Sequence, residues 1–81
     1  MYPNPTELRA ARALLGWTQE EAAKTSGISV RTLIAVEKGE GTTKALHNIM
    51  GALMGAGLRF MMLPEGEVQI TYRRPERDPT P

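Results

Sequence analysis

The chain has 81 residues, with 10 Lys and Arg, 9 Asp and Glu, one His, no Cys and a formal net charge of +1. This length predicts one small domain, and the lack of cysteine excludes disulfides and thiolate metal sites. The sequence contains no run of about 18 apolar residues that could form a transmembrane helix. Its N-terminal segment lacks the basic and apolar regions of a signal peptide. We therefore expect a cytoplasmic protein without a membrane partner. No acid–base pair, activated nucleophile or Gly-rich phosphate loop is evident, so we expect neither an enzyme nor a bound metal or cofactor.

The first predicted helix follows Asn4, which can accept a hydrogen bond as its N-cap. Pro5 suits the first helical position, and Glu7, three residues after the cap, completes a capping box. Gly16 suits the left-handed conformation that ends many helices. The apolar residues of this segment then fall on one face at helical spacing.

Two short helices are predicted next, over "TQEEAAKTS" and "SVRTLIAVEKG". Thr18 and Glu21 form a T-x-x-E capping box for the first of them. Ser29 can cap the second and Gly39 can end it. The helices are joined by a tight turn at Gly27, which is the pattern of a helix-turn-helix.

A fourth helix is predicted within "EGTTKALHNIMGALMGAG", with Thr43 as its cap and with Gly55 and Gly57 ending it. Its core stripe consists of Leu46, Ile49 and Leu53, and a second stripe beside it consists of His47, Met50 and Met54.

After the fourth helix, the spacing of apolar residues changes from the helical period to the alternation that is typical of β-strands. The β-prone segments "LRFMML" and "VQITYR" flank the turn "PEGE", and the second alternates apolar with polar residues. We therefore predict a helix-turn-helix domain over residues 1–58, a β-hairpin used for dimerisation over residues 59–73, and a disordered, Pro-rich charged tail over residues 74–81.

The second stripe of the fourth helix and the apolar face of the hairpin are more than one chain of this size can bury, and a lone hairpin is only marginally stable. We therefore expect a homodimer. The residues expected in its interface are His47, Met50, Met54, Phe60, Met62, Val68, Ile70 and Tyr72.

The segment "RAARALLGWTQEEAAKTSGISVRTLIAVEKGE" resembles the helix-turn-helix of the Xre/Cro and phage-repressor family. The resemblance rests on the "TQEE" opening, small Ala23, Gly27 in the turn, apolar Leu33, and Glu37 followed by Gly39, and it extends over roughly residues 8–55. Ala22 stands where this family usually has Leu, and Trp17 is a candidate to fill the space. The hairpin in place of a fifth helix resembles small antitoxins and prophage-type regulators that dimerise through β-strands.

The resemblance implies a mainly α fold, a four-helix phage-repressor-like domain, in which the second helix of the motif enters the major groove of double-stranded DNA. It also implies that Gln19 contacts a phosphate and that Arg12 pairs with Glu37. Lys44 holds the place of basic residues that reach the DNA backbone.

The predicted recognition helix carries Val30, Ile34 and Ala35, whose side chains cannot read hydrogen-bond patterns. Ile34 could pack on protein, or this surface could meet thymine methyl groups. Arg31 could be a solvated charge, but its place at the centre of the exposed face favours a contact with a phosphate or with a base, for which guanine is the commonest partner of arginine. The residues expected to contact DNA are Gln19, Ser29, Val30, Arg31, Thr32, Ile34, Ala35, Lys38 and Lys44.

The sequence therefore predicts a DNA-binding transcriptional regulator, a homodimeric repressor of its own operon that binds a near-palindromic operator. The alternative is an interaction module, such as an antitoxin whose main role is to bind a toxin partner.

Overall fold

The computed structural model describes residues 3–73, and within them four helices precede a two-stranded antiparallel sheet. In chain order the elements are α1 (Pro5–Leu15), α2 (Gln19–Ser26), α3 (Val30–Glu37), α4 (Thr43–Gly55), β1 (Leu58–Met62) and β2 (Val68–Tyr72). The predicted fold class is confirmed.

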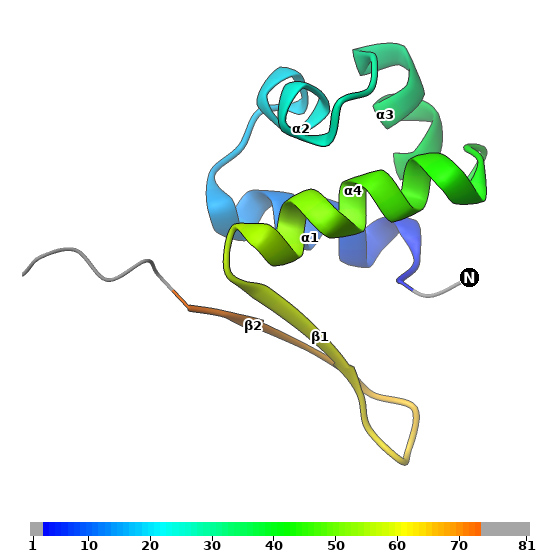
Figure 1. Ribbon diagram of the computed structural model, residues 1–81. Helices are drawn as coiled ribbons and strands as arrows, with labels where there is room; N and C mark the ends of the chain where they lie inside the picture. The colour runs from blue at the N-terminus through cyan, green and yellow to red at the C-terminus, as the bar shows by residue number, and fades with distance from the viewer. Residues whose placement is uncertain (1–2, 74–81) are drawn as a thin grey trace, which may run out of the picture.

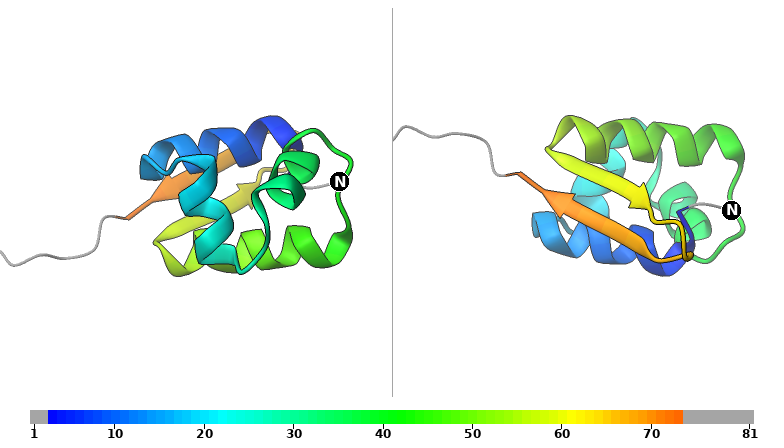
Figure 2. Two further views of the ribbon diagram at one scale, coloured as in Figure 1. Left: turned by 90° about the horizontal axis from the view of Figure 1, so that it is seen from above. Right: turned by 90° about the horizontal axis from the view of Figure 1, so that it is seen from below.

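The elements form three layers (Figure 1). α1 and α4 make the middle layer, with α2 and α3 on one side of it and the hairpin on the other. Seen from below, the hairpin crosses the space between α1 and α4 (Figure 2), and β1 contacts α4 while β2 contacts α1. The helix-turn-helix and the hairpin are therefore at opposite ends of the molecule.

The ends of the helices show why the sequence breaks where it does. Asn4 Oδ1 accepts a hydrogen bond from the backbone N–H of Glu7, and the Glu7 carboxylate accepts one from the Asn4 N–H, each at 2.8 Å. Thr18 and Glu21 form the same reciprocal pair at the start of α2. These capping boxes satisfy N–H groups that a helix cannot bond internally.

The cap of α4 differs from the sequence prediction by one residue. Thr42, and not Thr43, is the N-cap, and its Oγ1 accepts a hydrogen bond from the Ala45 N–H at 3.1 Å. Two adjacent threonines offer the same cap chemistry, and the path of the chain selects between them.

The core lies between the three layers. Its buried residues are Leu8, Ala11, Ala22, Ala23, Leu33, Val36, Ala45, Leu46, Ile49, Leu53 and Leu58. Leu58, the first residue of β1, is 0% exposed and anchors the hairpin to the helices. Trp17 is half-buried and packs against this core.

The hairpin turns its apolar face towards the helices. Phe60, Ile70 and Tyr72 are half-buried against the core, whereas Met62 at the far end of the same face is 55% exposed. Much of the apolar face that the sequence assigns to a dimer interface is thus used within one chain. The tail predicted to be disordered, residues 74–81, lies outside the described residues.

Gly41 marks a close approach between the α3–α4 connection and the core. A Cβ at Gly41 would collide with Val36 Cγ2 and lie 3.1 Å from Val36 Cα, and Val36 is buried. We expect Gly41→Ala to lower the free energy of unfolding by about 1–3 kcal/mol, because overpacking forces the neighbours to shift. Urea denaturation followed by circular dichroism measures this.

Gly51→Ala is the matched control for this prediction. Gly51 is inside α4, and a Cβ there meets nothing within 4 Å. Its replacement should stabilise the protein by about 0.5–1 kcal/mol through helix propensity. Equal effects of the two substitutions would contradict the close approach at Gly41.

Candidate nucleic-acid interface

The turn between α2 and α3 sets the crossing of the two helices. Gly27 takes the left-handed conformation at φ 74°, which costs a glycine little, and the Ile28 N–H then donates to Ala23 O at 3.0 Å. Ser29 Oγ accepts from the Thr32 N–H at 3.0 Å and caps α3. Leu33 of α3, 1% exposed, and the small Ala23 of α2, 2% exposed, are buried in the same core cluster.

The carboxylate of Glu37, at the last turn of α3, is held by side chains from two other helices. Arg12 Nε lies 2.7 Å from Glu37 Oε2 and Arg12 Nη2 lies 3.4 Å from Oε1, so α1 pairs with α3 as the sequence prediction states. The Glu37 side chain is only 6% exposed and that of Arg12 is 21% exposed. Arg12 also donates from Nη1 to Trp17 O at 3.0 Å, which ties the α1–α2 connection to the same guanidinium.

Gln19 completes this set of contacts. Its Nε2 donates to Glu37 Oε1 at 3.2 Å, so α2 also holds the end of α3. The resemblance implies a phosphate contact for Gln19 instead. An amide nitrogen carries two hydrogens, so one donor remains for a phosphate, and the two roles are compatible.

Arg9 is a functional candidate that the sequence reasoning missed. Its Nη1 donates to the backbone carbonyl of Glu37, and its Nη2 donates to Thr6 Oγ1 at 3.3 Å. The Glu37 carbonyl is at the end of α3, where carbonyls lack partners within the helix. The spacing of Arg9 and Arg12, one turn apart on α1, was the available signal.

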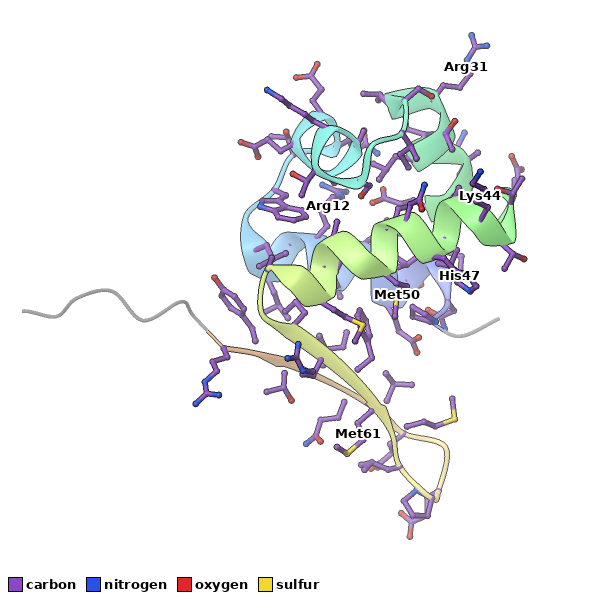
Figure 3. The ribbon with its side chains drawn as sticks, viewed as in Figure 1. Arg12, Arg31, Lys44, His47, Met50 and Met61 are labelled. Carbon is purple, nitrogen blue, oxygen red and sulfur yellow. The ribbon has the colours of Figure 1, made fainter. Side chains whose placement is uncertain are left out.

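The opposite end of α3 is open to solvent. Arg31 is exposed and extends from the end of the molecule that is farthest from the hairpin (Figure 3). Ile34 and Ala35 are half-exposed on the same helix. This surface therefore combines one cation with small apolar groups.

Three other residues predicted to contact DNA are partly used for folding. Val30 is half-buried and packs against the core. Ser29 Oγ donates to Thr32 Oγ1 at 2.9 Å in addition to capping α3. Part of each of these side chains is therefore not available to contact a ligand.

Two predicted phosphate-binding lysines are exposed next to α3. Lys38 is the C-cap of α3, and Lys44 is in the first turn of α4, near the end of α3 (Figure 3). The C-terminal end of α3 and the N-terminal end of α4 thus each present a cation.

Among the residues predicted for a dimer interface, His47 is one turn along α4 from Lys44. His47 and Met50 are on the side of α4 that faces the hairpin (Figure 3). His47 is exposed, Met50 packs partly on the core, and Met54 is 43% exposed. Among residues 3–73 there is no group of three or more His, Asp and Glu side chains that could hold a metal.

A family model described as helix-turn-helix matches residues 8–47, which include α1, α2, α3 and the start of α4. These residues form a helix-turn-helix domain of the Xre/Cro-like family, which is a family of DNA-binding transcription regulators. No curated protein matches the chain. In the described part of the chain, every helix is too short or too polar to cross a bilayer.

The contacts of Glu37 lead to a prediction about the stability of variants at Arg12 and Glu37. Arg12→Ala leaves a nearly buried carboxylate without its cation, and we expect a loss of about 3–5 kcal/mol in the free energy of unfolding. Replacing both partners, as in Arg12→Met with Glu37→Met, should cost less than Arg12→Ala alone, because no buried charge is left unpaired. Thermal melts compare the variants, and equal small losses in both would show that the pair does not hold α3.

Proposed function

We propose that this regulator is a homodimeric, cytoplasmic repressor that binds a near-palindromic operator in its own operon. The observation that carries the proposal is the exposed Arg31 at the start of α3, at the end of the molecule opposite the hairpin. A dimer that occupies promoter DNA can repress without any further chemistry. Residues around the hairpin, at the other end, remain accessible to a second copy.

The proposed reading surface consists of Arg31, Ile34 and Ala35 of α3, and in it Arg31 alone makes a directional contact with a base. The Arg31 guanidinium donates two hydrogen bonds to O6 and N7 of a guanine in the major groove. Ile34 and Ala35 have no donor or acceptor, and they pack on the C5-methyl groups of neighbouring thymines. Each half-site then contains one fixed G·C pair beside T-rich positions.

The proposed phosphate contacts position this surface. Lys38 and Lys44 neutralise backbone phosphates near the C-terminal end of α3, and the free hydrogen of the Gln19 amide donates to a further phosphate. Such contacts fix the register of the protein on the duplex and carry no sequence information.

A partner protein is the second candidate function. Met61 and Met62 are each 55% exposed near the tip of the hairpin. Flexible methionine side chains suit adaptable protein contacts, which favours an antitoxin-like role in binding a toxin. A pull-down in the absence of DNA, with Arg31→Ala in the bait, separates this role from DNA binding.

Arg31→Ala tests the directional contact. With an operator selected from random duplexes, the variant should lose about 1–3 kcal/mol of discrimination at one G·C pair in each half-site, while binding to unrelated duplexes changes little. Lys44→Ala is the contrast, because it should weaken binding to all duplexes and lower the salt slope by about one. Fluorescence anisotropy over a salt series measures both. The base assignment fails if Arg31→Ala and Lys44→Ala behave alike.

Uracil substitution tests the apolar part of the surface. Replacing the thymines next to the G·C pair by uracil removes only methyl groups, so wild-type affinity should fall, and Ile34→Ser should reduce this sensitivity. If uracil has no effect at any position of the operator, Ile34 does not contact a methyl group.

A further inference from the structure

We propose that β2 is the dimerisation edge: β2 of one chain pairs antiparallel with β2 of a second copy, so that the two hairpins form one continuous four-stranded sheet. This inference rests on the proposed homodimer and names its contact. Among residues 3–73, no further strand pairs with the outer side of β2.

The hydrogen-bond pattern of the hairpin determines which backbone groups point outwards. Leu63 N–H donates to Glu67 O at 2.7 Å and Arg73 N–H donates to Gly57 O at 2.9 Å, so these opposed pairs are hydrogen-bonded. Bonded and non-bonded pairs alternate along an antiparallel ladder. The backbone groups of Val68, Ile70 and Tyr72 therefore point away from β1. Within residues 3–73 these groups have no hydrogen-bond partner.

The outer edge of β1 differs at its base, because a side chain covers the first carbonyl of this edge. Arg59 Nη1 donates to Leu58 O at 2.8 Å and to Met54 O at 3.2 Å, which closes the base of this edge against the end of α4. The described part of β2 has none of the usual protections of an edge strand, such as a proline, a bulge or a lysine. Of the two edges, β2 is thus the one that can accept a partner strand.

The charges along β2 fit a second copy of the same strand. If the two-fold axis passes at Ile70, Val68 of one chain is opposite Tyr72 of the other, and Gln69 is opposite Thr71. One residue further out, the exposed Glu67 of each chain is opposite the exposed Arg73 of the other chain, so this pair occurs twice in the dimer. No like charges meet in this register. Cross-strand pairs of opposite charge stabilise a ladder.

The orientation of the dimer also suits DNA. The two-fold axis of an antiparallel strand pair can run perpendicular to the sheet, and such an axis keeps both helical layers on the same side. Because the hairpin lies across α1 and α4 from α3, both α3 helices then face one duplex (Figure 1). Half-sites about 34 Å apart are the spacing that a helix-turn-helix dimer needs.

Charge reversal tests this register. Glu67 and Arg73 are at opposite ends of β2, about 20 Å apart at the rise of a strand, so they cannot pair within one chain. Glu67→Arg or Arg73→Glu alone should weaken dimerisation about tenfold or more, because two attractive pairs become repulsive. The double variant should return the dimer dissociation constant to about the wild-type value. Sedimentation equilibrium without DNA measures it.

Glu65→Arg is the matched control, because Glu65 is exposed in the turn and is opposite no charge in this register. It should change the dissociation constant less than either single reversal does. A monomeric wild-type protein, or a double variant as weak as the single variants, overturns the proposal, as does pairing only with a strand of another protein.

Proline substitution tests the edge itself. Val68 and Met62 are opposite each other in the hairpin, and both N–H groups point outwards, Val68 on β2 and Met62 on β1. Val68→Pro should abolish dimerisation, whereas Met62→Pro should preserve it, and circular dichroism should show both folded, since proline is tolerated on edges. Deleting the hairpin would be less informative, because Phe60, Ile70 and Tyr72 cover the core.

The proline variants also separate this inference from the proposed function. Monomeric Val68→Pro should still prefer a single operator half-site over an unrelated duplex. If the wild-type protein is dimeric but shows no preference for the half-site, the proposed sequence-specific DNA binding is contradicted, whereas the proposed pairing through β2 still stands. A dimeric Val68→Pro or a monomeric Met62→Pro would overturn the β2 assignment.

Discussion

The orientation of α3 depends on one nearly buried carboxylate. An ionised group removed from water is costly unless charged and polar partners surround it, and Glu37 finds them on α1 and α2. Arg12 supplies the cation and Gln19 a further donor, while Arg9 bonds the carbonyl of the same residue. Any rotation of α3 would break several of these contacts together, so the helix has one orientation relative to the other two.

The two ends of α3 are used differently, although Val30 in the first turn also packs partly against the core. The C-terminal turn is bound to protein, while the N-terminal turn presents Arg31 to solvent. A reading surface has to be rigid to discriminate between bases, because discrimination depends on placing donors within hydrogen-bond distance. The hairpin, on the far side of α1 and α4, stabilises the core through Leu58 without touching that surface.

Much of this fold could be predicted from local chemistry. The caps at Asn4, Thr18 and Ser29 and the strand alternation follow from short-range preferences that the sequence displays directly. The direction in which the hairpin turns its apolar face depends on tertiary packing, so its use against the chain's own core could not be predicted from the pattern. A one-residue choice between Thr42 and Thr43 depends in the same way on the path of the chain.

The candidate site was predictable only in part. The Arg12–Glu37 pair came from the resemblance to a family, whereas the contacts of Arg9 and Gln19 with Glu37 join residues 28 and 18 positions apart. No periodicity encodes contacts at such separations. For the other residues predicted to contact DNA, the exposure in the folded chain determines whether the side chain can bind. Arg31 is exposed and can bind, whereas Val30, on the same helix, is partly used for packing.

Selection of binding sites from a pool of random duplexes tests whether the N-terminal turn of α3 contacts the bases of DNA in a dimer with two symmetric halves. We expect an enriched near-palindrome whose half-sites are centred about 34 Å apart, each with a single invariant G·C pair. Enrichment of no motif, or of one asymmetric site without a second half, would contradict it.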